Sequence, residues 1–308
     1  MPEPAKSTRW LPQYLILALV WGASFAFTEA GLLVTSPLGI TATRHAIGAA
    51  VLIIIMLLSS KIKLLRTAPA LLWKRMLVVA ILLNVIPGYL FAFAQNHIST
   101  VIASIINSAT PILTVLMLLL VFRTEPVTKR QIVGIMIGLA GGLIALGIEP
   151  GDLGENDPIG VLAVFGAIVC YGFAIPYVRK SITPLSDSYL LLATMQVSIA
   201  ALITCSMFFF EVATFGEAFS TPSPWIATQI LILGIGTGIA YVWHFQLIER
   251  AGSAVASTIT YPTLLVSLVI GWIVLREKFG WEMVVGAVLI VIGSAVTQQR
   301  QVQLKQQR

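Results

Sequence analysis

Charged side chains are scarce in this sequence. Aspartate, glutamate, lysine and arginine together make up 10% of its 308 residues, whereas a typical soluble domain carries about 25%. Hydrophobic residues make up 57%, and the mean hydropathy is +0.93. So few charges cannot cover the surface of a soluble protein. The composition therefore predicts that lipid surrounds most of the chain.

Cysteine and histidine are also scarce, which argues against metal and thiol chemistry. The two cysteines, Cys170 and Cys205, lie in apolar runs, where thiols are usually unreactive. The three histidines, His45, His97 and His244, are far apart in the chain, and none has a metal-ligating partner at a suitable spacing. Since no hydrolase, kinase or metal-binding motif is convincing either, the sequence predicts no cofactor and no enzymatic activity.

Ten apolar runs are long enough to cross the hydrocarbon core of a bilayer, which takes about 20 helical residues. We therefore predict an all-α integral membrane protein with ten transmembrane helices. The predicted spans are Tyr14–Leu33, Leu38–Leu58, Met76–Ala94, Thr100–Phe122, Ile132–Ile148, Ile159–Val178, Tyr189–Phe210, Trp225–Ile248, Ala251–Leu275 and Trp281–Val296.

The basic residues orient these spans. If the N-terminus is cytoplasmic and the spans alternate, 16 of the 19 lysines and arginines face the cytoplasm, as the positive-inside rule requires. An acidic linker at 149–158 then lies outside, and a tail at 300–308 lies inside. We expect a multi-pass protein of the inner (plasma) membrane with both termini in the cytoplasm. The net charge of +6 is accounted for by these loops, so no nucleic-acid partner is expected.

Two segments about 150 residues apart resemble each other. Gln95 corresponds to Gln246, and Pro111 corresponds to Pro262 at the same offset. Because each unit contains five spans, an odd number, the second unit must be inverted relative to the first. We predict two inverted five-helix repeats, 1–148 and 159–299, which is a recurring plan of secondary transporters.

Short motifs recur in order in both halves. WGASF at Trp21–Phe25 corresponds to YGFAIP at Tyr171–Pro176, and Arg44 lies in the second span. An Ala-Ser, proline and glutamate pattern occurs as Ala103-Ser104, Pro111 and Glu125, and again as Ala256-Ser257, Pro262 and Glu277. In these motifs the chain resembles the EamA-type permeases of the drug/metabolite transporter superfamily. The resemblance implies export of metabolites, such as amino acids or amphipathic compounds, from the cytoplasm.

Polar residues inside the spans are expected to face the bundle interior, because exposing them to lipid is costly. They could hold helices together by hydrogen bonds or line a substrate cavity, and we favour the cavity because the pattern repeats in both halves. Aromatic residues near them would form its wall. The predicted substrate-binding residues are Trp21, Phe25, Asn84, Gln95, Asn107, Tyr171, Tyr241, His244, Gln246, Thr258 and Tyr261.

Prolines and charges inside the spans suggest moving parts. Pro111 and Pro262 interrupt equivalent helices and are predicted hinges. Arg44 could pair with Glu29, bind a substrate carboxylate or reach toward the headgroups. Glu29 and His244 are candidate proton carriers. The glycine runs GLAGG at 138–142 and GIGTG at 234–238 lie inside apolar spans, so we interpret them as helix-packing sites.

These observations favour a secondary transporter that exports small metabolites by alternating access. Its expected partners are a small-molecule substrate, the lipid bilayer and, as a coupling ion, protons, and it would be a monomer or a homodimer. Two alternatives stay open at this point: a membrane-embedded enzyme acting on lipid-like substrates, and a structural or sensory subunit that transports nothing.

Overall fold

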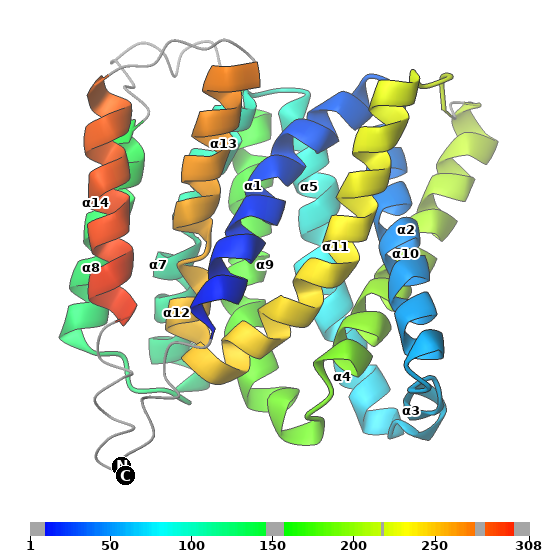
Figure 1. Ribbon diagram of the computed structural model, residues 1–308, viewed down its shortest axis with the longest axis horizontal. Coiled ribbons are helices and arrows are strands. Elements are labelled where there is room, and N and C mark those ends of the chain that lie inside the picture. Colours follow the sequence, from blue (N-terminus) through cyan, green and yellow to red (C-terminus); the bar gives the residue numbers. More distant parts are fainter. Residues whose placement is uncertain (1–9, 146–156, 217–218, 275–280, 299–308) are drawn as a thin grey trace.

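The protein folds as a bundle of helices (Figure 1). The computed structural model describes residues 10–145, 157–216, 219–274 and 281–298, and within those ranges it contains helices and turns but no strand. The predicted tail, Glu277 and most of the acidic linker lie outside the described residues. The longer helices are α1 (Leu11–Leu32), α2 (Pro37–Leu58), α4 (Ala70–Ala80), α5 (Ile86–Gln95), α6 (Thr100–Ser108), α7 (Thr110–Met117), α8 (Lys129–Ala145), α9 (Pro158–Ser181), α10 (Tyr189–Phe215), α11 (Pro224–Ala251), α13 (Thr260–Val274) and α14 (Trp281–Gln298).

Short helical segments connect or extend these. A single turn, α3, follows α2, and two π-helical turns, η1 and η2, continue α4 and α7 without a break. A 3-10 turn, η4, follows α9, and α12 precedes α13. Their bounds are Lys63–Thr67 (α3), Ile81–Val85 (η1), Leu118–Phe122 (η2), Thr183–Leu185 (η4) and Ser253–Ser257 (α12).

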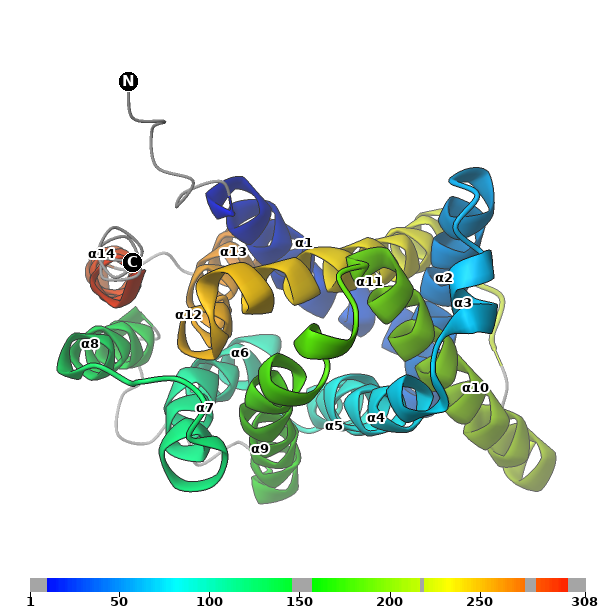
Figure 2. The ribbon, with the colours of Figure 1, turned by 90° about the horizontal axis from the view of Figure 1, so that it is seen from below.

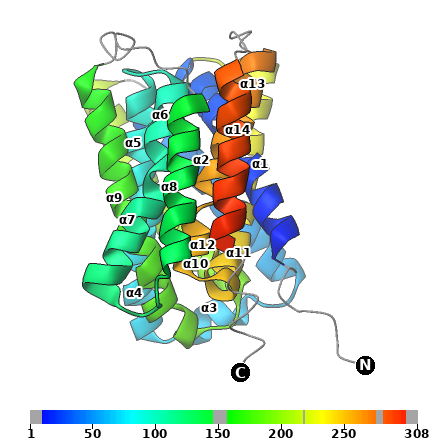
Figure 3. The same cartoon turned by 90° about the vertical axis from the view of Figure 1, so that its left-hand side faces the viewer.

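Among the described residues, eight continuous helical stretches are long and apolar enough to cross a membrane. The shorter α8 and α14 occupy the two remaining predicted spans, which makes ten an approximate count. Figures 2 and 3 show α8 and α14 side by side at one edge of the bundle. The predicted class, an all-helical membrane protein, is confirmed.

Several helices begin at a capping side chain at the end of a loop. The Ser36 hydroxyl accepts a hydrogen bond from the Gly39 amide at 3.0 Å, and Pro37 follows as the first helical residue. Proline suits this position because its missing N–H would have no intrahelical partner there. Four further helices have a side-chain cap, at Ser99, Asp157, Ser188 and Ser223, and proline follows the cap in the last of these and in the one capped by Asp157.

The two halves run in opposite directions. In Figure 1, α1 rises through the bundle whereas its counterpart α9 descends, and α2 and α10 are related in the same way. Hydrogen bonds agree with this picture. Tyr14, near the start of α1, donates a hydrogen bond to the Thr258 carbonyl. Arg179, near the end of α9, donates one to the Ile248 carbonyl, and Ile248 and Thr258 are close to each other in the sequence. The start of α1 and the end of α9 therefore lie at the same end of the bundle.

Equivalent helices break at Pro111 and Pro262. The first break separates α6 from α7 at Ala109, and the second separates α12 from α13 at Thr258 and Ile259. A proline has no N–H to donate to the carbonyl four residues earlier, so each break exposes one backbone acceptor.

Buried hydroxyl groups satisfy the carbonyls that prolines expose. Pro87, which follows η1, creates a third acceptor of this kind. The freed carbonyls of Leu83, Asn107 and Thr258 accept hydrogen bonds from the hydroxyls of Tyr241, Thr110 and Tyr14, at 2.8, 2.7 and 2.8 Å respectively. Because an unpaired buried carbonyl is costly, these bonds stabilise the bends.

Glycines bring helix pairs into close contact. A Cβ atom added to Gly238 of α11 would lie 2.7 Å from the Gly48 carbonyl of α2. One added to Gly141 of α8 would lie 2.8 Å from the Gly286 carbonyl of α14. The packing interpretation of both glycine runs is confirmed. The crossing of α2 and α11 also brings Arg44, one turn before Gly48, close to α11.

Candidate functional site

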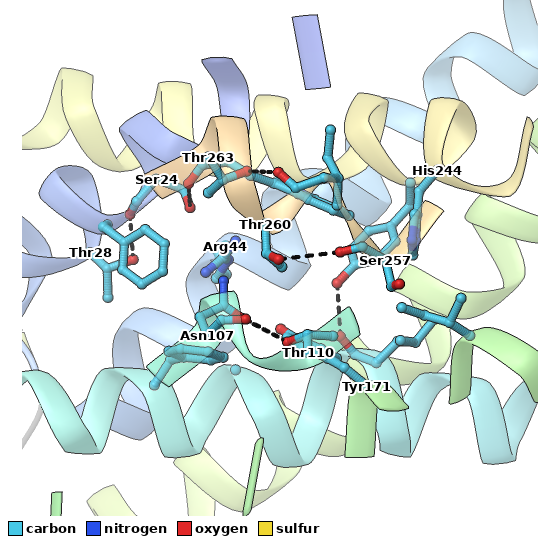
Figure 4. Close-up of a pocket in the computed structure, with 18 of the residues that line it drawn as sticks. Ser24, Thr28, Arg44, Asn107, Thr110, Tyr171, His244, Ser257, Thr260 and Thr263 are labelled. Atoms are coloured by element: carbon cyan, nitrogen blue, oxygen red, sulfur yellow. Dashed lines mark hydrogen bonds between the residues drawn. The ribbon is translucent and has the colours of Figure 1, made fainter. Parts of the chain in front are cut away.

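A cavity of about 100 Å³ lies at the centre of the bundle (Figure 4). This volume holds a handful of water molecules or a small solute. Both halves contribute helices to it, as expected of a site on an inverted-repeat axis. Its lining consists of Trp21, Ser24, Phe25, Thr28, Arg44, Leu83, Gly88, Phe91, Gln95, Asn107, Thr110, Tyr171, Ile175, Tyr241, His244, Ser257, Ile259, Thr260 and Thr263.

Aromatic rings form a continuous part of the wall. Phe91 of α5 lies edge-on to Phe25 of α1, with ring centroids 5.7 Å apart, and stacks on Tyr171 of α9 at 6.0 Å. On another part of the wall, Trp21 packs edge-on against His244 at 4.9 Å. These contacts hold each ring in place. The wall can therefore accept the apolar part of a ligand without rearrangement.

Hydroxyl groups interrupt this aromatic wall. Ser24, Thr28, Thr110, Thr260 and Thr263 each donate a hydrogen bond to a backbone carbonyl three or four residues earlier, at 2.7–3.2 Å. Such bonds are common for serine and threonine in helices. Since each hydroxyl has one hydrogen, these groups face the cavity mainly as acceptors.

Arg44 is the one charged side chain in the described lining. Its Nε donates a hydrogen bond to the Thr237 hydroxyl at 3.1 Å. In the described part of the chain, its guanidinium forms no ion pair with any carboxylate. The charge pair with Glu29 that we considered from sequence is therefore not formed here, because Glu29 lies exposed and accepts a hydrogen bond from Thr100 instead.

The lining is polar toward one end of the bundle. The Gln95 amide donates to the carbonyl of Phe25 at 3.1 Å and to the Thr100 hydroxyl at 2.7 Å. Thr100 in turn donates to the exposed Glu29 carboxylate at 3.0 Å. This chain of hydrogen bonds connects the lining to the surface and marks the polar rim of the cavity.

At the opposite end, contacts between the halves close the bundle. The Glu125 carboxylate accepts hydrogen bonds from the Ser253 hydroxyl at 2.6 Å and from the Ser253 amide at 3.1 Å. Arg179 lies 3.9 Å from the same carboxylate and donates to the Ile248 carbonyl at 3.2 Å. We call Glu125, Arg179 and Ser253 the closure cluster.

The structure brings most of the predicted site residues together. Seven of the eleven predicted substrate-binding residues line the cavity, and Arg44 lies among them. The seven are Trp21, Phe25, Gln95, Asn107, Tyr171, Tyr241 and His244. The other four, Asn84, Gln246, Thr258 and Tyr261, lie outside the lining, as do Pro111 and Pro262 at the helix breaks.

Asn84 lies in a separate buried polar cluster behind the cavity. Its amide lies 3.3 Å from His45 Nε2, and its carbonyl oxygen accepts a hydrogen bond from Gln196. Thr204 of α10 contacts the other ring nitrogen of His45 at 3.4 Å. This placement matches the interhelical alternative, because the π-helical turn η1 rotates Asn84 away from the face that carries Gln95.

Thr258, Tyr261 and Gln246 have other surroundings. The Thr258 side chain contacts Tyr14 at 3.0 Å, and the Tyr261 hydroxyl donates to the Ile135 carbonyl of α8 at 2.7 Å. Gln246 lies two residues after His244, and two residues turn a helix by about 200°. The expectation that Gln246 faces inward came from its repeat partner alone, and the helical rotation places it on the other side of α11.

Hydroxyl-bearing residues were the main omission from the predicted site. Ser24 and Thr28 follow Trp21 at intervals of three and seven residues, which puts them on its face of α1. Thr260 and Thr263 form a similar pair at the start of α13. For Ser24 and Thr28, helical spacing from Trp21, which was already in the prediction, was the signal that could have identified them.

Comparisons with known proteins agree with this architecture. The sequence matches the EamA-like transporter family over residues 8–147 and again over residues 158–298. It is 26% identical over 280 residues to the uncharacterized transporter YvbV of Bacillus subtilis (strain 168), covering 89% of this chain and 87% of that protein. It is 22% identical over 287 residues to protein PecM of Dickeya dadantii (strain 3937), covering 91% and 89%. A solved crystal structure superimposes with a TM-score of 0.74 at 20% identity, covering 95% of this chain and 97% of the other.

Proposed function

The chain belongs to the EamA-like transporter family, and on that premise we propose that it exports small metabolites by alternating access. It is a multi-pass membrane transporter, and its named relatives include other transporters. Amino acids and small amphipathic compounds are the proposed substrates. The observation that carries the proposal is the central cavity, which both halves build from aromatic rings, hydroxyl groups and one arginine.

The two ends of the cavity support alternating access. The closure cluster joins the first half to the second at one end, whereas the lining reaches the polar rim at the other. If the halves rock about the breaks at Pro111 and Pro262, the closure cluster separates and the rim closes. We therefore propose the two prolines as hinges and the cavity as the site that both openings share.

Charge supports the proposed orientation. The end of the bundle with the closure cluster also carries Arg75, which donates to the Ser181 carbonyl, and the exposed Arg66 of α3. Basic residues concentrate on the cytoplasmic side of inner-membrane proteins. We propose that this end faces the cytoplasm with both termini, so that this conformation is closed to the cytoplasm.

We also propose limits for the two repeats and residues that carry protons. The repeats span 1–148 and 159–299, joined by an external linker at 149–158 and followed by a cytoplasmic tail at 300–308. Glu29, on the rim, is the proposed proton carrier, because the described residues leave it exposed to water rather than paired with a cation. His244 packs against Trp21 inside the cavity and is the second candidate.

Flux measurements test the proposal. Purified protein would be reconstituted into liposomes, and efflux of amino acids and small amphipathic compounds would be compared with that from protein-free liposomes. Phe91→Ala removes a ring that bridges Phe25 and Tyr171, so we expect flux to fall about tenfold. Phe209→Ala is the matched control, because Phe209 is 75% exposed on α10. If the wild-type protein releases none of these compounds, the proposed function is wrong.

A further inference from the structure

We infer that Lys61, Lys63 and Arg66 form a docking surface for the headgroup of an anionic phospholipid, at the end of the bundle that we place in the cytoplasm. We call these three residues the α3 surface, because they belong to α3 and to the turn that precedes it. This partner is distinct from any transported compound, so it lies beyond the proposed function.

Acidic residues are missing from a long part of the first half. Between Glu29 and Glu125 the sequence contains no aspartate or glutamate, but it contains seven lysines and arginines. Five of these seven lie within residues 61–75, directly after the span formed by α2. A cluster of cations in this position is typical of segments that bind the anionic lipids of the cytoplasmic leaflet.

Other cations at this end of the bundle already have partners in the protein. Arg75 of α4 donates to the Ser181 carbonyl at 2.7 Å, and the Lys180 ammonium of α9 lies 5.8 Å from the centroid of the Phe122 ring. The α3 surface differs from them. Within the part of the chain that the structure describes, its three side chains are exposed and form no ion pair or hydrogen bond. They are therefore available to an external anion.

The backbone directs these cations outward. Ser60 has a φ of 56°, in the left-handed region, and this turn leads the chain from α2 into α3. Ile62 and Leu65, three residues apart, pack against the buried apolar core. Lys63 and Arg66 are also three residues apart, so they share the other, exposed face. Figures 1 and 2 show α3 beside α2 at the edge of the bundle.

Apolar side chains lie next to these cations along the chain. Ile54 and Leu58, one turn apart near the end of α2, are exposed, and Leu58 is 83% exposed. Leu64 of α3 and Trp73 of α4 are exposed as well, and tryptophan is enriched at the membrane interface. A phospholipid has the same arrangement, with a headgroup at the interface and acyl chains in the hydrocarbon. One lipid would therefore contact both the cations and the apolar end of α2.

The charge of the α3 surface selects an anionic lipid. The planar guanidinium of Arg66 can donate two parallel hydrogen bonds to phosphate oxygens, and each lysine adds a positive point charge. A zwitterionic lipid such as phosphatidylcholine carries its own cation, which these side chains would repel. Phosphatidylglycerol carries a phosphate and an uncharged glycerol, so it represents the expected class.

Native mass spectrometry tests this assignment. The protein would be placed in nanodiscs that contain equal parts of phosphatidylglycerol and phosphatidylcholine with identical acyl chains. After its release, the lipids that remain bound would be counted. Because each cation close to an anionic headgroup strengthens binding severalfold, we expect the wild-type protein to retain phosphatidylglycerol about tenfold over phosphatidylcholine.

Two matched double variants locate the preference. Lys63→Gln with Arg66→Gln should abolish most of it, because two of the three cations are lost. Arg123→Gln with Lys129→Gln is the control, since it also removes one exposed arginine and one exposed lysine, between α7 and α8. The control should retain phosphatidylglycerol as the wild-type protein does. Thermal unfolding in a neutral detergent would establish that both variants are folded.

Hydrogen–deuterium exchange provides a second readout on the wild-type protein. The amides of residues 59–67 should exchange more slowly in nanodiscs of phosphatidylglycerol than in nanodiscs of phosphatidylcholine, because a bound headgroup covers this turn. Equal exchange in the two lipids would contradict docking at α3.

Three results of the retention experiment would overturn the assignment. The first is equal retention of the two lipids by the wild-type protein. The second is an unchanged preference in the Lys63→Gln, Arg66→Gln protein. The third is an equal loss in both double variants, which would show a general attraction to anionic bilayers instead of a site on α3. None of these measurements involves flux, so failure of the proposed transport function would leave the lipid assignment standing.

Discussion

At the residue scale, hydroxyl groups replace the backbone donors that prolines remove. The Thr258 carbonyl, which Pro262 cannot pair with, accepts a hydrogen bond from the Tyr14 hydroxyl at 2.8 Å and another from the Tyr261 amide at 3.0 Å. Tyr14 is 3% exposed, so this hydrogen bond is buried in the bundle. Tyr14 therefore joins α1 directly to the break between α12 and α13. Both α1 and α13 contribute residues to the cavity lining.

Removing this hydroxyl should destabilise the protein. Tyr14→Phe keeps the ring but removes one of the two hydrogen bonds that the Thr258 carbonyl accepts, the other coming from the Tyr261 amide at 3.0 Å, at an expected cost of about 0.5–1.5 kcal/mol. Tyr89→Phe is the control, because Tyr89 is 37% exposed on α5 and its hydroxyl should contribute little. Chemical unfolding in detergent would measure both. Equal stability of the two variants would contradict this account of the break.

The sequence shows which single residues are polar inside a span but not which neighbour each one meets. Gln95 and Asn84 lie eleven residues apart, a near-integral number of helical turns, which predicts that they share a face. The π-helical turn at Ile81–Val85 adds rotation between them that spacing cannot reveal. Asn84 consequently meets His45 and Gln196 rather than the cavity.

At the element scale, the close packing of α8 against α14 requires glycines, which have no side chain, at the contact. A Cβ atom added to Gly293 of α14 would lie 2.4 Å from the Gly138 nitrogen and 2.6 Å from the Gly134 carbonyl of α8. Both atoms belong to the backbone, so they cannot move aside as a side chain could. The two helices would have to separate.

Gly293→Ala should therefore destabilise the protein by about 1–3 kcal/mol, although alanine is intrinsically the better helix former by about 1 kcal/mol. Gly166→Ala on α9 is the matched control. The nearest atom to its added Cβ would be Leu90 Cδ1 at 3.3 Å, at the end of a flexible side chain. We expect that variant to be neutral or slightly more stable. Thermal unfolding of both variants would check this, and a Gly293→Ala protein as stable as the control would disprove the close contact.

Most elements could be predicted from hydropathy and from the prolines and capping residues of the loops, because ten apolar runs alternate with loops that contain such residues. The span predicted at Trp225–Ile248 is the helix Pro224–Ala251, and the breaks near Pro111 and Pro262 lie where prolines indicated them. The third helix begins earlier than predicted, at Ala70 rather than Met76. The charges of Lys74 and Arg75 are typical of a loop, so the predicted span begins after them. These residues can nevertheless belong to a helix end, because their long side chains can reach the aqueous phase.

At the scale of the whole molecule, the inverted arrangement relates the two ends of the cavity to each other. Equivalent helices from the two halves approach the centre in opposite directions, so the rim near Gln95 and the closure cluster near Ser253 are built from corresponding parts of the two repeats. The inversion of the repeats could be predicted from the sequence because each unit contains five spans, an odd number. Which end is closed could not, since that depends on the balance of contacts such as those of Glu125.

If transport requires the closure cluster to separate, then linking its two sides should stop transport. Glu125 and Ser253 belong to different halves and are in hydrogen-bond contact, so cysteines at these positions would be within reach of a short, reducible bifunctional thiol reagent. Cys170 and Cys205 would first be replaced by alanine. We expect the reagent to abolish flux in the Glu125→Cys, Ser253→Cys protein and a reducing agent to restore it.

The control for this experiment joins two positions within one half. Tyr189 begins α10 and Arg250 lies near the end of α11, and the two side chains are close enough to interact. Cross-linking Tyr189→Cys to Arg250→Cys should leave flux unchanged, because a half that moves as a unit keeps this distance. Arrest by both links would show that the halves do not move as rigid bodies. Undiminished flux through a fully cross-linked Glu125–Ser253 pair would show that this end does not open, and the alternating-access proposal would have to be abandoned.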